Sequence, residues 1–328
     1  EEPPVCSCET ACTAEAMNAD CPICGAEGAL PENCECSEPI ENAEPEGEEN
    51  EGQPEGEVSA PQPETALTAL IGGSETVTEV STADELTAAI ADVKFDTVKL
   101  AANISISSSL TVNRAVTLDL NGYVLKYESA NNGSVIVVEN GGQLTIEDSN
   151  TSNLSHKFNP NGKLWVLDEA SGTEAVTGGV ITGGTGTDIS TFGGTTWYCG
   201  GGALIKNGGS LTMRGGNIIG CSAECGGGVC IDSEQGQFSM SGGSIAGCVA
   251  SDIGGGVFAS GTFKMSGQAV IRSCTAESAT QYVCGGGVYV NVSSSFEMSD
   301  TAIIEGCQAI STPSSPSKGG GVHLANNT

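Results

Sequence analysis

The sequence predicts an all-β fold, a right-handed parallel β-helix with three short strands per coil and a short N-terminal capping α-helix. Its main basis is an internal repeat: Gly-Gly-Gly or a variant recurs at Gly200, Gly226, Gly254, Gly285 and Gly319, in steps of 26, 28, 31 and 34 residues. Two more blocks recur within each unit, so every unit holds three short apolar blocks separated by turns. Such units cannot bury their apolar faces alone, and stacking them produces a solenoid.

The two further blocks define the other strands of each coil. One block contains Leu211-Thr212-Met213, Phe238-Ser239-Met240, Phe263-Lys264-Met265 and Phe296-Glu297-Met298, and the other runs from Ile218 to Cys221, Ile245 to Cys248, Ile271 to Cys274 and Ile304 to Cys307. Successive side chains of a strand point to opposite faces, so the Phe and Met side chains are expected to point inward. The same alternation turns Val229/Ile231, Val257/Ala259 and Val288/Val290 inward. Glycine at the corners allows positive φ or close approach of backbones.

The β-helix is expected to span residues 75–328. Thr82-Ala83-Asp84-Glu85 has the form of a capping box and precedes apolar residues at helical spacing, which predicts a helix over about 82–92. We expect this helix to cover the open edge of the first coil. Apolar residues then alternate with period two from Val98 to Ile146, as in short strands. At the other end we expect an array truncated at Thr328, one strand into a coil.

Two segments precede the predicted β-helix. Residues 1–38 are rich in cysteine, and residues 39–74 form an acidic Pro/Glu/Gly segment that we expect to be a disordered linker. Cys6, Cys8, Cys21 and Cys24 are candidate zinc ligands, because Cys-x-x-Cys spacing brings two thiolates together in a tight turn. A small disulfide-stapled module is the alternative for this segment.

Charge and cysteine content limit the partners and the compartment. The net charge is −30, and residues 1–64 hold 18 acidic residues and no Lys or Arg. Nucleic acid and anionic membranes would repel such a chain. Fifteen cysteines favour a secreted or cell-surface protein, and we interpret the chain as a mature product without its signal peptide. No apolar stretch is long enough to span a bilayer, and we expect a monomer without a cofactor.

Gly-Gly-Gly-Val, Phe-x-Met-Ser-Gly-Gly and Ile-x-Gly-Cys-x-Ala resemble repeats of right-handed β-helix surface proteins, of the pectin-lyase-like superfold, from Gram-positive gut anaerobes. More loosely they resemble the repeats of chlamydial outer-membrane adhesins. The resemblance covers about 75–328 and extends to the Cys-rich leader, and it implies adhesion or surface display. The family's third block usually ends in Gly-Asn-x-Ala, with an asparagine ladder. Here cysteines occupy that column, either inside the coil or at its corner.

The cysteines of the repeats form two columns. One contains Cys221, Cys248, Cys274 and Cys307, and the other contains Cys199, Cys225 and Cys284, interrupted by Ile253 and Lys318. Neighbours in a column would have Cα atoms about 5 Å apart, within the disulfide range. Cys221–Cys248, Cys274–Cys307 and Cys199–Cys225 are therefore candidate disulfides, and buried thiols are the alternative.

A binding surface is predicted at two places. Residues 149–176, which include Trp165, interrupt the repeat and should form an excursion from the coil. Elsewhere, Phe258 and Tyr289 should stack on the outward side of one strand, with His323 next to them. The segment from Cys to the following Gly triplet grows through 5, 6, 11 and 12 residues beside them. Incidental exposed aromatic residues are the alternative interpretation.

The sequence does not show the residue patterns expected of a polysaccharide-cleaving β-helix enzyme. The sequence lacks an Asp-Asp dipeptide, an Arg-x-Lys motif and a histidine with an acidic partner nearby in sequence. We therefore identify no catalytic residue and favour a non-enzymatic adhesin-like or structural module that presents loops to a glycan or protein ligand. The alternative is a polysaccharide lyase or glycoside hydrolase whose site lies outside this chain or is poorly represented in it.

Overall fold

The computed structural model describes residues 76–150, 154–190, 196–278, 283–311 and 316–326. The chain separates into two compact units, Glu1–Leu70 and Ile71–Thr328, and all described residues belong to the second. The expected Cys-rich segment and acidic linker, with the zinc candidates Cys6, Cys8, Cys21 and Cys24, lie outside the described residues.

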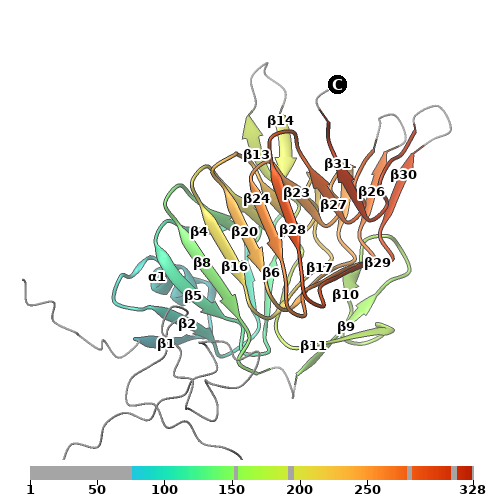
Figure 1. Ribbon diagram of the computed structural model, residues 1–328. Helices are drawn as coiled ribbons and strands as arrows, with labels where there is room; N and C mark the ends of the chain where they lie inside the picture. Colours follow the sequence, from blue (N-terminus) through green and yellow to red (C-terminus); the bar gives the residue numbers. More distant parts are fainter. Residues whose placement is uncertain (1–75, 151–153, 191–195, 279–282, 312–315, 327–328) are drawn as a thin grey trace, which may run out of the picture. The chain divides into compact units, whose positions relative to one another are not determined.

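The described unit is an all-β protein of stacked coils with a parallel β-helix-like architecture (Figure 1). Three long parallel sheets run along the stack. The first contains β1 (Val77–Val80), β2 (Thr97–Leu100), β5 (Ala115–Asp119), β8 (Gln143–Glu147), β16 (Ser210–Met213), β20 (Gln237–Met240), β24 (Thr262–Met265) and β28 (Ser295–Met298). The second contains β3 (Ile104–Ile106), β6 (Val124–Tyr127), β12 (Val180–Thr182), β17 (Asn217–Ile219), β21 (Ser244–Ala246), β25 (Val270–Arg272) and β29 (Ile303–Glu305). The third contains β4 (Leu110–Val112), β7 (Ile136–Val138), β15 (Ala203–Ile205), β19 (Val229–Ile231), β23 (Val257–Ala259), β27 (Val288–Val290) and β31 (Val322–Leu324).

Equivalent residues of successive units lie over one another, as the repeat predicts. In the first sheet Leu211 pairs with Phe238, which pairs with Phe263, and the two Phe rings stack 5.0 Å apart. The predicted inward residues Val229, Ile231, Phe238 and Met240, together with their counterparts in the next coil, are almost completely buried in one core. In the last coil the inward side chains are less buried, and Met298 is 43% exposed.

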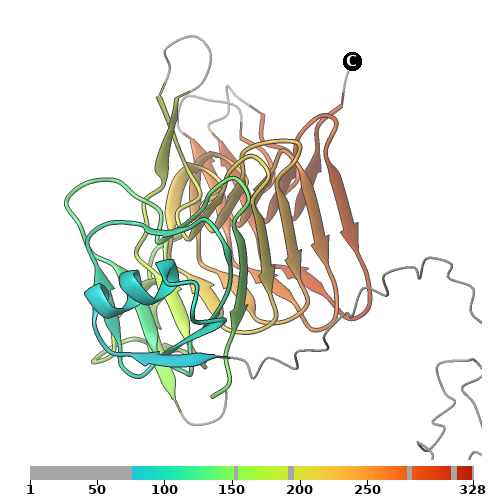
Figure 2. The same ribbon diagram turned by 90° about the vertical axis from the view of Figure 1, so that its left-hand side faces the viewer.

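The predicted helix is present as α1 (Ala83–Ala91). Thr82 is its N-cap, and both hydrogen bonds of the capping box with Glu85 are formed. Leu86, Ala89 and Ile90 are buried. The helix packs against β1, β2, β3 and β4, at the same end of the stack as the first coil (Figure 2).

Three strands per coil holds only in the first coils, so this part of the prediction is corrected. A fourth sheet accompanies the later coils and contains β13 (Thr187–Ser190), β14 (Thr196–Cys199), β18 (Ser222–Cys225), β22 (Val249–Ile253), β26 (Thr275–Ser278) and β30 (Gln308–Ser311). From β18 onward it is built from the segment between the cysteine and the Gly triplet, which grows along the chain, and β13 and β14 precede the first triplet. The register shifts between Ala223 and Cys225 because β22 carries one more residue than β18.

The Gly triplets are required by geometry at the corner before the third sheet. The first glycine of each triplet has positive φ, as at Gly226 (+63°) and Gly254 (+68°), where a side chain would be strained. The second glycine lies against the next coil: a Cβ on Gly227 would come 2.5 Å from the backbone oxygen of Gly255. The triplet therefore permits both the turn and the close stacking of coils.

Candidate ligand-binding groove and cysteine columns

The outward face of the third sheet carries a column that changes from aliphatic to aromatic along the stack. Leu204 of β15 is followed by Cys230, Phe258, Tyr289 and His323 at equivalent positions of β19, β23, β27 and β31. The ring centroids of Phe258 and Tyr289 lie 5.5 Å apart, and those of Tyr289 and His323 lie 5.4 Å apart. Three of the four predicted binding-surface residues thus form one aromatic column.

A groove with a volume of about 350 Å³ lies between this aromatic column and the fourth sheet. Phe258 and Tyr289 form one side, and Ile189 and Trp197 of the β13–β14 hairpin form another part of its wall. The other lining residues are Cys199, Cys225, Asp232, Ile253, Ser260 and Asn291. Trp197 was not among the predicted binding residues, because only the antiparallel hairpin β13–β14 brings it beside the aromatic column. Predominantly apolar walls with a few polar groups are typical of ligand sites.

Two carboxyl groups in and near the groove are partly desolvated. Burial raises the pKa of Asp232, which lines the groove, to about 6, although Lys206 opposes this shift. One carboxylate oxygen of Asp232 is buried without a hydrogen-bond partner among the described residues. Burial also raises the pKa of Asp252 to about 6, and the charge of Glu224 adds to the effect. The groove therefore combines aromatic walls with an acidic edge.

The column Cys221, Cys248, Cys274 and Cys307 lies inside the coil and not at its corner. The first three side chains are completely buried in the central core, and Cys307 of the last coil is partly exposed. All four are thiols in the structure, including the candidate pairs Cys221–Cys248 and Cys274–Cys307. Each donates to backbone oxygen atoms, as Cys248 does to Ala246 at 3.5 Å and Ile218 at 3.7 Å.

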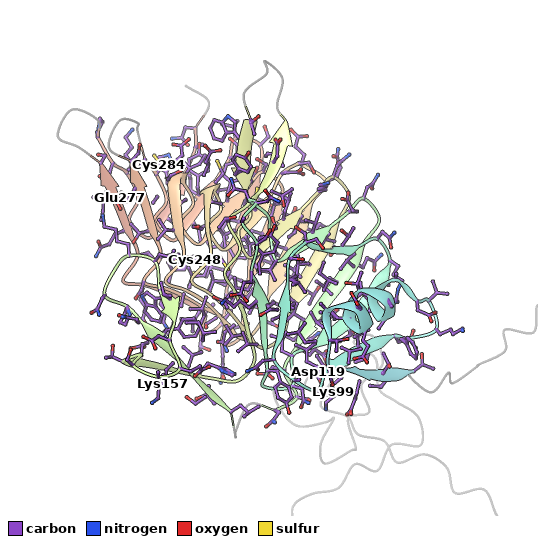
Figure 3. All side chains as sticks on the ribbon, turned by 180° about the vertical axis from the view of Figure 1, so that it is seen from behind. Lys99, Asp119, Lys157, Cys248, Glu277 and Cys284 are labelled. Atoms are coloured by element: carbon purple, nitrogen blue, oxygen red, sulfur yellow. The ribbon has the colours of Figure 1, made fainter. Side chains whose placement is uncertain are left out.

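The second cysteine column belongs to the groove. Cys199 of β14 pairs in register with Cys225 of β18, and Cys284 continues the column after Ile253. Cys230, which the columns read from the sequence did not include, packs in one apolar cluster with Cys199 and Cys225. The repeat alone could not place Cys230 beside Cys199 and Cys225, because it lies in β19 whereas they lie in β14 and β18. Figure 3 labels Cys248 of the inner column and Cys284 of the outer column.

Trp165 lies apart from the other predicted binding residues. It belongs to the predicted excursion, which forms an antiparallel flap of β9 (Ser155–Asn159), β10 (Val166–Leu167) and β11 (Glu174–Thr177). Trp165 is 7% exposed, packs with residues of the second sheet such as Ile219 and Ala246, and has the Arg272 guanidinium 4.8 Å from its ring centroid. The flap covers a sheet face, so Trp165 serves packing.

His156 also serves the flap. It is 5% exposed, and its ring nitrogens contact a Glu169 carboxylate oxygen and the backbone oxygen of Gly122, each at 2.8 Å. The sequence shows no acidic partner near His156 along the chain, and the fold supplies one, because the flap brings Glu169 back over β9. The contact with Glu169 lies within the flap, and the contact with Gly122 joins the flap to the second coil.

Further features of the described ranges concern metal and membranes. Within residues 76–326, excluding the gaps, no group of three or more His, Cys, Asp or Glu is arranged to hold a metal ion. Over the same residues no helix has the length and apolar character needed to span a membrane.

A second hollow of about 560 Å³ is lined by glycine and polar residues such as Asp148, Arg214 and Gln268, without an aromatic side chain.

Comparison with known proteins gives no relative: no family model, curated protein or solved structure matches this chain.

Proposed function

We propose that this chain is a non-enzymatic, secreted or cell-surface β-helix module, adhesin-like in role, that binds a ligand in the groove between the third and fourth sheets. The observation that carries the proposal is the aromatic column Phe258, Tyr289 and His323 beside Trp197 of the hairpin. Half-buried aromatic side chains supply much of the energy at binding surfaces, since they add contact area at little entropic cost.

The geometry of the column favours a protein segment over a sugar ring as ligand. The planes of Phe258 and Tyr289 differ by 9°, so each ring covers a face of the other. The ring edges are then directed to the groove, and the edge of an aromatic ring carries partial positive charge. Apolar side chains and carbonyl groups suit such a surface, while the acidic edge at Asp232 suits a basic side chain. A glycan remains the second ligand class to be tested.

The proposal extends to the handedness of the coils, the role of α1 and the export of the protein. We infer that the coils are right-handed, because crossover connections between parallel strands are right-handed in almost every known case. We infer that α1 protects the edge of the first coil from pairing with other chains. The resemblance to surface proteins of gut anaerobes and the fifteen cysteines support export from the cell.

The test is a binding array of glycans, mucins and extracellular proteins probed with the purified full chain. The variant Phe258→Ala/Tyr289→Ala removes the groove wall and should lower affinity for a captured ligand at least about tenfold. Val166→Ala removes an apolar side chain of the flap that is 57% exposed, and it should leave binding unchanged.

A second experiment distinguishes a binding module from a polysaccharide-degrading enzyme. Acidic and neutral polysaccharides are incubated with the chain, and shortened or unsaturated products are sought. Depolymerisation would favour a lyase or hydrolase over a binding module. Equal binding by the wild type and the Phe258→Ala/Tyr289→Ala variant would place the ligand away from the groove.

A further inference from the structure

Three thiols meet where the β13–β14 hairpin joins the coils. The only register pair between β14 and β18 is Cys199↔Cys225. Both residues are 1% exposed, yet both line the floor of the groove. Cys199, Cys225 and Cys230 pack in one apolar cluster. The hairpin therefore joins β18 at a pair of residues that are chemically able to form a covalent bond.

We propose that Cys199 and Cys225 are a redox-active dithiol, which closes to a disulfide by exchange with a low-molecular-weight disulfide and so fixes the hairpin to the coils. This proposal does not depend on the identity of a groove ligand. It assigns the two cysteines a modification chemistry, whereas the inner column serves packing.

The backbone geometry is compatible with this bond. Neighbouring parallel strands lie about 4.8 Å apart, within the range of Cα separations found in disulfides. Cys199 and Cys225 are in register, lie in one apolar cluster and face the same groove.

The exchange proceeds in two balanced steps. The Cys199 thiolate attacks one sulfur of the small disulfide, forming a mixed disulfide and releasing one small thiolate. The Cys225 sulfur, as its proton leaves, then attacks the Cys199 sulfur and displaces the second small thiolate. The two protons of the protein thiols end on the two small thiols, and the small disulfide is the oxidant.

Cys199 is suited to the first attack. Hydrogen bonds from the Cys225 and Cys230 thiols lower the pKa of Cys199 to about 5, against the opposing effect of burial. The same contact with Cys199 raises the pKa of Cys225. Since the thiolate is the nucleophile, we take Cys199 of the hairpin as the attacking residue, and its in-register neighbour Cys225 as the resolving one.

Cys230 is the less suitable partner. It is completely buried on β19 of the third sheet and does not line the groove. Burial, followed by the contact with Cys199, raises the pKa of Cys230. A metal is not the natural occupant either, since the described part of the chain holds no arrangement of three such ligands fit for one.

The test compares the two columns within one molecule. The native full chain is incubated with oxidised glutathione, quenched with acid, unfolded, alkylated and digested with trypsin. Cys199 is the sole cysteine between Lys163 and Lys206, and the peptide that ends at Lys264 holds Cys221, Cys225, Cys230 and Cys248. Mass spectrometry detects the linkage of the two peptides, and fragmentation assigns the partner cysteine. We expect this linkage to form at least about tenfold faster than any between Cys221 and Cys248, which lie in the closed core.

Variants identify the partner and the order of attack. Cys230→Ser should keep the linkage, and Cys225→Ser should abolish it and leave Cys199 joined to glutathione. Cys248→Ser is the matched control in the inner column and should not change the reaction at Cys199. Equal rates in both columns of the wild type, or a bond between Cys199 and Cys230, would overturn the proposal.

Discussion

The interior of the coil and its groove use the same residues for different purposes. Phe238 and Phe263 stack at 5.0 Å inside the coil, and Phe258 and Tyr289 stack at 5.5 Å on the outside. Cys221 and Cys248 follow one another inside, as Cys199 and Cys225 do in the groove. Strand spacing sets both stacks, so residue type and spacing alone do not separate core from site. The two aromatic pairs differ in their access to water, and the two cysteine pairs differ in that only Cys199 and Cys225 line a groove.

The largest expected effect compares two phenylalanines. Phe263→Ala leaves a cavity in the closed core and should lower the free energy of unfolding by about 4 kcal/mol. Phe258→Ala exposes a surface that already faces the groove and should cost about 1 kcal/mol, as expected for a half-buried ring. Chemical denaturation under reducing conditions measures both, and similar losses would show that the groove is as closed as the core.

A smaller effect separates the cysteine columns. Cys248→Ser places a hydroxyl in the apolar core and should destabilise the fold by about 2 kcal/mol, because burial of a polar group is costly. Cys225→Ser lies at the groove floor, where the sulfur of the neighbouring Cys199 can accept a hydrogen bond from the hydroxyl, and it should lower the free energy of unfolding by about 1 kcal/mol. Chemical denaturation with the thiols kept reduced measures both variants. A larger loss of unfolding free energy in Cys225→Ser than in Cys248→Ser would contradict the prediction.

The smallest effect concerns pH at the acidic edge of the groove. The folded pKa of Asp232, about 6, lies above the unfolded value of about 3.9, so the folded carboxyl group holds a proton in the window between these values. Its contribution therefore stabilises the fold progressively as pH falls from 7 towards 4.

The variant Asp232→Asn removes this contribution. It should raise the free energy of unfolding at pH 7 by about 1 kcal/mol, a value reduced for solvent screening of a partly exposed group, and flatten its pH dependence. Unfolding curves from pH 4 to 8 measure this. Asp252→Asn is the companion variant, since Asp252 titrates in the same direction. An unchanged pH profile in both variants would contradict the desolvation of this edge.

Much of the fold could be predicted because the stack is repetitive. Each inward residue meets its counterpart one coil further on, so the alternation at Phe238/Met240 directly implied a core ladder. Thr82 and Glu85 are three residues apart, so the capping box that they form could be predicted from the local sequence. The fourth sheet was not predicted, because the segments between cysteine and Gly triplet differ in length and hide their common strand.

The candidate site was only partly predictable. Phe258, Tyr289 and His323 share one repeat position, so their column followed from the repeat. Trp197 is contributed by a hairpin that departs from the repeat, and its position depends on antiparallel pairing with β13. Trp165 belongs to a flap whose docking on the second sheet buries it. A position outside the repeat carries no information about its neighbours in space.

The sequence by itself determined that units stack, which residues face inward and where the aromatic column lies. These features depend on contacts between equivalent positions, and the repeat encodes such contacts directly. Only the tertiary structure decided that the hairpin and the fourth sheet enclose a groove, and that Cys199, Cys225 and Cys230 meet at its floor. Those contacts join non-equivalent positions, which are set by how strands of unequal length pack and not by the period of the chain.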